Sequence, residues 1–211
     1  MTPGLTFSVD EGVGTFRLAR PDRLNSLTFA LYRDLVDRFA ALQNDPSVRV
    51  VIITGEGKGF CSGGDVHEII GDLVHRGPDE IMAFARMTGD VIRNMRRLRK
   101  PVIAAINGTA AGAGAVIALA CDLRIASSRA KIAFLFTKVG LTGADMGAAF
   151  LLPRVVGLAR ASELLMLGDT LEAKRAAEMG LTTRWWSRIP SWIVQPSLPA
   201  GWRMVRVLRW P

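Results

Sequence analysis

The sequence is poor in the residues that build disulfide frameworks and metal sites. It holds 2 Cys and 2 His among 211 residues, too few for a disulfide-stapled scaffold or a multi-cysteine zinc site. The start, MTPGLTFSVDEG, has neither the basic stretch nor the apolar stretch of a secretion signal. These absences predict a protein without a bound metal in a reducing, cytoplasmic setting.

Composition indicates a globular chain. Hydrophobic residues make up 49% and charged residues 22% of the sequence, which is ordinary for a folded domain. The length suits one large domain, or one domain with an appendage. The net charge of +8 is a reason to consider a nucleic-acid partner, but the distribution of that charge argues against one.

Residues 182–211 differ in composition from the rest of the chain. From residue 184 onward there are five Arg, no acid, all five Trp and four of the ten Pro. The Arg of this tail account for 5 of the 8 net charges, so residues 1–183 carry an ordinary excess and no nucleic-acid partner is predicted. The tail shows no helical or strand period. One interpretation is a segment foreign to the fold, such as a shifted reading frame. The other is an Arg/Trp anchor for a membrane or RNA, which the lack of an amphipathic face disfavours.

Hydrophobic patterning predicts strands that alternate with helices. The run VRVVIIT is typical of a parallel strand that is covered on both faces. This alternation predicts an α/β fold with mainly parallel pairing. Strands are expected over residues 5–9, 14–19, 48–54, 122–127 and 131–134, and helices over 28–43, 78–99, 145–152, 160–167 and 172–179.

Residues 101–121 form a stretch without any charged residue, so a transmembrane helix has to be considered. Three glycines interrupt the stretch, and its first part, PVIAAI, is typical of a strand. The prediction is therefore a buried strand, a Gly/Ala turn and a short buried helix, with no membrane span.

Two strand-to-helix turns share one design. GFCSGGD and NGTAAGAG each place small residues where a strand ends and a helix begins, and Asp65 with Glu68 fits a capping box. Helix N-termini have unpaired N–H groups and a partial positive charge. Two such turns side by side would aim two N–H groups at one oxygen, as in an oxyanion hole. The alternatives are close packing of helix on strand, and a dinucleotide loop, which Ile117 breaks at the third glycine position.

Several segments together resemble the crotonase superfamily, the enoyl-CoA hydratase/isomerase family, over about residues 5–181. The resemblance implies a ClpP/crotonase-like spiral of repeated β-β-α units, with a core over residues 1–181 and an atypical tail over 182–211. It also implies an acyl-CoA thioester as partner and substrate, and no separate cofactor. The matching segments are RPDRLNSL, GFCSGGD, KPVIAAINGTAAGAG, CDLRIAS, LLPRVVGLARASELLMLGD and AAEMGL.

The resemblance assigns the site residue by residue. It makes the Ser62 and Ala113 N–H groups the two oxyanion donors, with Ala113 where the family usually has Gly. These two and Asp145 are the expected catalytic residues. The expected acyl-CoA-binding residues are Arg23, Leu24, Ser26, Ser62, Gly63, Gly64, Asp65, Val116 and Phe136.

Departures from the family pattern exclude hydration by the paired-glutamate route. Val116 and Phe136 stand where the hydratases of the family carry two Glu, and neither side chain can transfer a proton. Asp145 is the remaining acid, one residue removed from where related isomerases and a dehalogenase carry an Asp. It is interpreted either as a helix N-cap or as the single acid/base of the site. An apolar pocket lined by Val116 and Phe136 would raise its pKa.

Three functions stay open at this point: an enoyl-CoA hydratase/isomerase-type lyase or isomerase, an inactive acyl-CoA-binding pseudoenzyme, and a disfavoured dinucleotide-dependent oxidoreductase. Members of the family assemble as homotrimers or hexamers through C-terminal helices that also cover the acyl pocket. Because residues 182–211 do not resemble those helices, we expect an exposed apolar face and reduced stability, and no assured oligomer or activity.

Overall fold

The computed structural model describes residues 2–73 and 75–186, which form two sheets and the helices around them. The larger sheet has the order β1-β2-β3-β5-β7-β10. β1 and β2 are antiparallel, and every other neighbouring pair in this sheet is parallel. Its strands are Leu5–Asp10 (β1), Val13–Leu18 (β2), Val50–Gly55 (β3), Val102–Ile106 (β5), Leu123–Ser127 (β7) and Arg184–Trp186 (β10).

The smaller sheet has the order β4-β6-β8-β9, with β8 and β9 antiparallel and the other pairs parallel. Three times the chain leaves a strand of the larger sheet and enters one of the smaller: β3 to β4, β5 to β6 and β7 to β8. This repeat confirms the predicted spiral of β-β-α units. The strands of the smaller sheet are Gly59–Cys61 (β4), Thr109–Ala111 (β6), Lys131–Ala133 (β8) and Thr170–Glu172 (β9).

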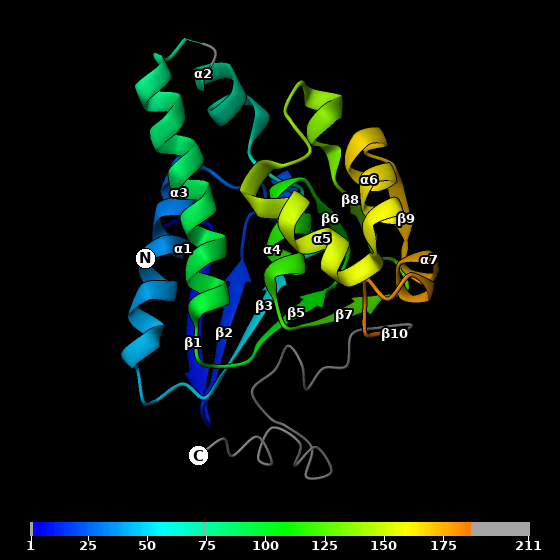
Figure 1. The fold of residues 1–211 in the computed structure, drawn as a ribbon. Helices are drawn as coiled ribbons and strands as arrows, with labels where there is room; N and C mark the ends of the chain where they lie inside the picture. Colours follow the sequence, from blue (N-terminus) through cyan, green and yellow to red (C-terminus); the bar gives the residue numbers. More distant parts are fainter. Residues whose placement is uncertain (1, 74, 187–211) are drawn as a thin grey trace.

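Helices pack on both sides of the strands (Figure 1). α1 and α3 lie side by side, and α5, α6 and α7 gather at the other end of the molecule. The α-helices are Phe29–Ala41 (α1), Gly71–Leu73 (α2), Pro78–Arg97 (α3), Ala113–Ala120 (α4), Ala148–Val156 (α5), Leu158–Leu167 (α6) and Ala173–Glu178 (α7). Shorter turns are Pro21–Arg23 (η1), Leu42–Asn44 (η2), the π-helical Val66–Ile70 (η3), Leu135–Val139 (η4) and Asp145–Gly147 (η5).

Local sequence explains the helices that support the site. The Thr28 hydroxyl accepts a hydrogen bond from the Leu31 N–H at 3.2 Å and so caps α1. One face of α1 is buried, and the Phe39 ring lies 5.0 Å from that of Phe16. All eight residues of α4 are buried, because small and apolar residues occupy its whole circumference. The charge-free stretch is therefore a strand, a turn and a core helix, as predicted.

Two predictions about elements need correction. The segments 59–61 and 109–111, expected as parts of turns, are short strands of the second sheet. The helix expected from Asp145 begins only at Ala148, because Met146 adopts a left-handed φ of 52° that interrupts the helical path. Asp145 is therefore not the N-cap of that helix; Gly147 holds that position.

The sheet continues past residue 181. β10 pairs in parallel with β7, and the Thr183 N–H donates to the Arg124 carbonyl at 2.9 Å. The Arg124 guanidinium, itself buried, donates to the Leu181 carbonyl at 2.7 Å. The predicted division at residue 181 remains a prediction, and the Arg/Trp/Pro-rich stretch from residue 187 onward lies outside the described residues. None of the helices in the described ranges is long and apolar enough to cross a membrane.

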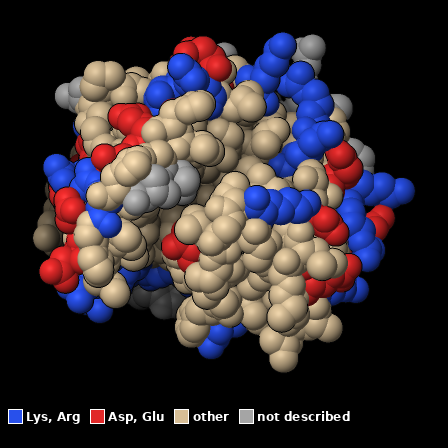
Figure 2. Space-filling model, turned by 90° about the horizontal axis from the view of Figure 1, so that it is seen from above, with Lys and Arg blue, Asp and Glu red and all other residues tan. Residues whose placement is uncertain are grey.

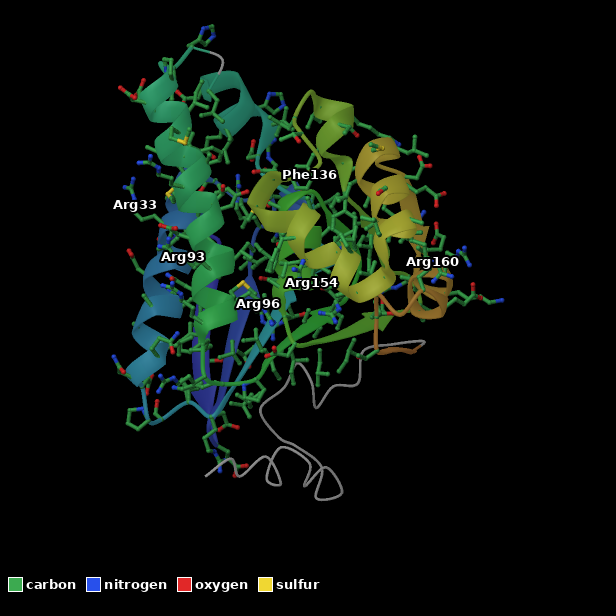
Figure 3. All side chains as sticks on the ribbon, in the orientation of Figure 1. Arg33, Arg93, Arg96, Phe136, Arg154 and Arg160 are labelled. Atoms are coloured by element: carbon green, nitrogen blue, oxygen red, sulfur yellow. The ribbon has the colours of Figure 1, made fainter. Side chains whose placement is uncertain are left out.

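An apolar surface covers the region of η4, α5 and α6. Figure 3 labels Arg154 and Arg160 on these two helices. Several large apolar side chains are exposed on these elements and just after η4, and such a surface is typical of contact with another chain. Assembly remains a prediction. The exposed residues are Val139, Leu141, Phe150, Leu158, Met166 and Leu167.

Candidate active site

The two predicted turns meet in the structure. A Cβ placed on Gly63 would lie 3.1 Å from the Ala111 carbonyl oxygen and 3.6 Å from the Ala113 nitrogen. Gly63 has φ +106° and Gly112 has φ +49°, a region that favours glycine. The sequence thus brings the start of η3 and the start of α4 into contact through residues without side chains.

Both turns present N–H groups that make no hydrogen bond with any described residue. In the first turn this group belongs to Gly64, and in the second such groups begin with Ala113, the first residue of α4. Both turns keep part of their surface exposed, at Gly64 and at Gly112. Ala113 is absent from the described residues with positive φ, so alanine fits there without strain.

The structure contradicts the assignment of the Ser62 N–H as a free donor. That N–H donates to the Leu24 carbonyl at 3.0 Å, and the Ser62 hydroxyl donates to the Arg23 carbonyl at 3.3 Å. The physical reason is that the loop before α1 packs along this turn, so that its Leu24 carbonyl accepts the Ser62 N–H. The donor that stays available is two residues further on, at Gly64.

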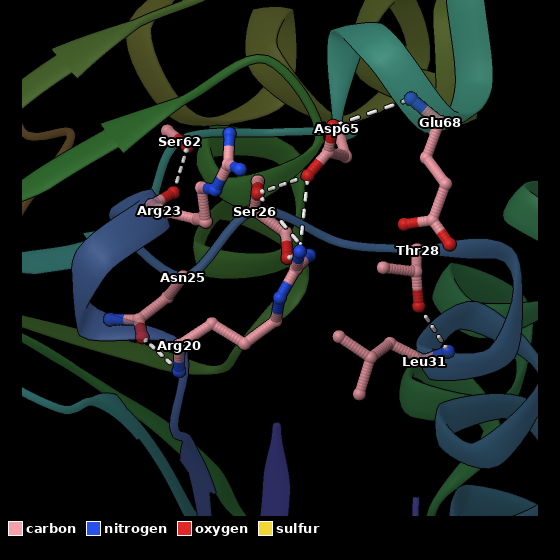
Figure 4. Close-up of polar contacts among 9 residues, drawn as sticks. All are labelled: Arg20, Arg23, Asn25, Ser26, Thr28, Leu31, Ser62, Asp65 and Glu68. Atoms are coloured by element: carbon pink, nitrogen blue, oxygen red, sulfur yellow. Dashed lines mark hydrogen bonds and ion pairs between the residues drawn. The ribbon is translucent and has the colours of Figure 1, made fainter. Parts of the chain in front are cut away.

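A largely buried ionic cluster connects the first turn to the loop before α1 (Figure 4). Asp65 accepts hydrogen bonds from the Arg20 guanidinium at 3.2 Å, the Ser26 hydroxyl at 3.1 Å and the Glu68 N–H at 3.3 Å. Burial acts to raise the pKa of Asp65, but these hydrogen bonds and the Arg20 charge outweigh it and hold the pKa below its usual value. Asp65 is therefore a fixed anion that supports the turn.

This cluster changes the expected roles of two residues. Ser26 and Asp65, expected to bind acyl-CoA, are 7% and 8% exposed and bond each other. Arg20, the first residue of the RPDRLNSL segment, was not predicted to have a role at the site. Arg23 and Leu24 are exposed on the same loop and remain candidates for contact with CoA.

Asp145 lies in the η5 turn, which packs against α3 and α4. Burial raises the pKa of its carboxyl group, although a hydrogen bond from the Met146 N–H to Oδ1, at 2.8 Å, acts in the opposite direction. The left-handed Met146 turns its N–H back toward the carboxylate. A carboxyl group with a raised pKa holds a proton more readily and is better suited to accept and return one.

The structure adds Tyr32 to this group. Its side chain comes from α1 and is 2% exposed, and a Cβ placed on Gly64 would lie 3.6 Å from its oxygen. Burial raises the pKa of Tyr32 well above its usual value, and the charges of Cys61 and Asp145 add to this. Asp145 therefore acts electrostatically on Tyr32, and Gly64 lies close to the Tyr32 oxygen. A single buried tyrosine at a helical spacing gave no sequence signal that would separate it from the core.

The two side chains expected to exclude hydration by the paired-glutamate route are both buried. Val116 is 0% and Phe136 is 4% exposed, and Phe136 lies in the interior (Figure 3). Whether the two side chains line one pocket with Asp145 remains a prediction. His67, just after the first turn, is exposed.

One end of the molecule has a hollowed surface. Figure 2 looks down on the end of the molecule near α2 and shows a hollow bordered mainly by uncharged side chains, with Lys and Arg gathered along one side. A separate pocket of about 460 Å³ is lined by Gln43, Asn44, Arg97 and Arg99. It lies at the far end of α1 from Asp65 and contains none of the groups above.

The thiols and acids do not form a second centre. Cys61 and Cys121 are both buried, and burial raises the pKa of each thiol to about 12, so neither is a ready nucleophile. Within residues 2–73 and 75–186, no group of three or more His, Cys, Asp or Glu side chains could hold a metal ion.

Several proteins are similar to this chain in sequence over most of its length. It is 42% identical over 173 residues to 1,2-epoxyphenylacetyl-CoA isomerase from Escherichia coli (strain K12), covering 82% of this chain and 66% of that protein. It is 39% identical over 176 residues to a probable enoyl-CoA hydratase, EchA12, from Mycobacterium tuberculosis (strain ATCC 25618 / H37Rv), covering 82% of this chain and 61% of that one. The chain thus spans less than two thirds of the length of these relatives.

Solved structures share the fold. A candidate enoyl-CoA hydratase from Streptomyces coelicolor A3(2) superposes with a TM-score of 0.85 at 53% identity, over 88% of this chain and 68% of that one. An enoyl-CoA hydratase from Mycobacterium avium subsp. paratuberculosis K-10 has a TM-score of 0.84 at 32% identity, over 100% and 77%. The family described as enoyl-CoA hydratase/isomerase matches residues 8–189, and the chain belongs to that family.

Proposed function

We propose that this chain acts on acyl-CoA thioesters by forming an enolate, with the thioester oxygen held by the Gly64 and Ala113 N–H groups. The observation that supports this most directly is the pair of unpaired N–H groups on two turns in contact. Small residues at both turns would let a thioester reach the backbone. The donor at the first turn is therefore Gly64 in place of Ser62.

Asp145 is the group proposed to move the proton. Its carboxylate would take a proton from a carbon activated by the thioester, and the C–H electrons would pass to the thioester oxygen. Each N–H donor aimed at that oxygen is worth about 3–4 kcal/mol in the transition state. Return of the proton from Asp145 to a different carbon completes an isomerisation, in which no atom is gained or lost.

Isomerisation is favoured over hydration. Hydration by the paired-glutamate route needs two carboxylates around a water, and Val116 and Phe136, both buried, occupy those positions. Two relatives are named as isomerases, of 1,2-epoxyphenylacetyl-CoA and of trans-2-decenoyl-[acyl-carrier-protein]. The proposed substrate class is an unsaturated or similarly activated acyl thioester. CoA arrives as part of the substrate, with Arg23 and Leu24 as contacts on the exposed loop.

The test removes the Ala113 N–H and leaves helix α4 intact. Proline is tolerated at the first position of a helix, where its missing N–H has no partner within the helix. We expect Ala113→Pro to slow enolate formation by about 10²- to 10³-fold. The measurement is deuterium uptake from D₂O into the acyl group of 3-hexenoyl-CoA and crotonyl-CoA, followed by mass spectrometry.

Ala113→Gly is the matched control, because it keeps the N–H and should exchange within a few-fold of wild type. Calorimetric titration with butyryl-CoA reports binding independently of turnover. Equal exchange in Ala113→Pro and Ala113→Gly would show that this N–H holds no oxyanion. Butyryl-CoA binding without exchange in the wild-type chain would instead favour the acyl-CoA-binding pseudoenzyme, which the enzyme names of the relatives do not support.

A further inference from the structure

The Tyr32 hydroxyl is largely enclosed, and it has no hydrogen-bond partner among the described residues. The residue is 2% exposed. Its ring packs edge-on against Phe84, with 5.6 Å between ring centroids and 89° between ring planes, but its oxygen makes no hydrogen bond within the described residues. Leaving a buried polar group unpaired costs about 1–3 kcal/mol. Apolar packing alone would be better served by phenylalanine.

The hydroxyl lies close to Gly64, one of the two residues whose N–H groups the proposed site would use. Its oxygen lies 3.6 Å from the position of a Cβ on Gly64, the residue whose N–H is free. Among the described residues, Thr182 Oγ1 is the sole side-chain atom that is both fully enclosed and without a partner. The Tyr32 oxygen therefore keeps a small opening, and the side on which Gly64 lies has no Cβ to close it.

We infer that Tyr32 is a specificity-determining residue whose hydroxyl donates a hydrogen bond to an oxygen carried on the acyl chain close to the thioester. This inference rests on the proposed function, because Gly64 and Ala113 set where the thioester lies. The Tyr32 oxygen lies 3.6 Å from the position of a Cβ on Gly64, so the acceptor would lie near the thioester. An acyl chain without such an oxygen leaves the hydroxyl unpaired and binds less well.

The raised pKa of Tyr32 is consistent with a donor role. Burial, with the charge of Asp145, keeps the hydroxyl protonated across the neutral range. It can therefore donate a hydrogen bond at any working pH but is a poor acid for proton transfer. Asp34 and Arg38 on the same helix pair with each other, and the Phe84 ring is the neighbour contributed by α3.

The experiment compares two ligands of equal chain length on the full 211-residue chain. Acetoacetyl-CoA carries an oxygen on its third carbon, and butyryl-CoA does not. We expect the wild type to prefer acetoacetyl-CoA, and Tyr32→Phe to lose about three- to tenfold of that preference by weakening acetoacetyl-CoA alone. Tyr32→Phe keeps the ring and its contact with Phe84, so the temperature of unfolding should stay the same or rise.

Phe84→Leu is the matched control, since it disturbs the same ring contact and leaves the hydroxyl in place. Its effect on the two ligands should be equal. An equal loss for both ligands in Tyr32→Phe would overturn the inference, because the hydroxyl would then contact the thioester or merely support the fold. No loss for either ligand would overturn it as well. If the wild type bound neither acetoacetyl-CoA nor butyryl-CoA, the proposed function itself would be refuted.

Discussion

Replacement of Asp145 by asparagine separates proton transfer from local structure. Asp145 Oδ1 accepts the Met146 N–H at 2.8 Å, and an asparagine carbonyl can accept the same hydrogen bond. The η5 turn should therefore persist while the titratable proton is lost. General acid–base catalysis by a placed side chain contributes about 10²- to 10⁴-fold, and we expect deuterium exchange into 3-hexenoyl-CoA to slow by that factor.

Asp145→Asn should slow the exchange reaction, but it should not lower the free energy of unfolding. Burial raises the pKa of Asp145 in the folded protein, so the folded state holds its proton more tightly than the unfolded state does. The resulting stabilisation is complete below the unfolded pKa of about 3.9 and is lost as the pH rises through the folded pKa. Asparagine does not ionise, so Asp145→Asn should be at least as stable as wild type at pH 7.

Two measurements decide this prediction. Deuterium exchange is followed from pH 4 to 8, where the wild-type rate should rise as the carboxyl group ionises and the residual rate of the variant should lack that step. Urea unfolding at the same pH values gives the free energies. Asp169→Asn is the control, since Asp169 is exposed and pairs only with Lys138 at 3.4 Å among described residues. Exchange as fast in Asp145→Asn as in wild type would refute the assignment.

Two further substitutions, together with one control variant, test the framework of the site. Asp65→Asn should lower the free energy of unfolding by about 1–2 kcal/mol at pH 7. Because the pKa of Asp65 is lowered, the wild type loses this contribution as the pH falls through the folded pKa, so urea unfolding at pH 3 should show a smaller difference. Gly114→Ala should cost about 3 kcal/mol or more, since its Cβ would lie 2.1 Å from the Cys61 carbonyl oxygen. Gly89→Ala in α3, where a Cβ meets nothing within 4 Å, should gain about 0.5–1 kcal/mol. A similar melting temperature for both glycine variants would contradict the packing argument.

Much of the fold could be predicted because its signals are local. Apolar β-branched runs identify β3 and β5, and Thr28 marks the start of α1 within one residue. The second sheet was missed since its strands are three residues long, too short to show a period. The start of α5 was missed because Met146 carries a left-handed backbone that glycine would normally signal.

The site was predictable to the level of the two turns and no further. Which N–H remains free at the first turn depends on how the loop before α1 packs on it, and that loop is close in space but 39 residues distant for Ser62 and Arg23. The roles of Arg20 and Tyr32 depend on contacts of the same long range with Asp65 and Gly64. Residue types alone do not encode such contacts.

The small residues of the second turn separate into two groups with different physical reasons. At Gly108 and Gly114 a Cβ would lie 1.8 Å from the Lys58 carbonyl oxygen and 2.1 Å from that of Cys61, so these glycines exist for close packing of the turn on β4. Ala113 tolerates a Cβ, and its N–H is free. Close packing therefore accounts for Gly108 and Gly114, and it holds the start of α4 beside the turn of Gly63 and Gly64. Packing and binding are two consequences of one arrangement, so a substitution that opens the packing should also separate the two N–H groups.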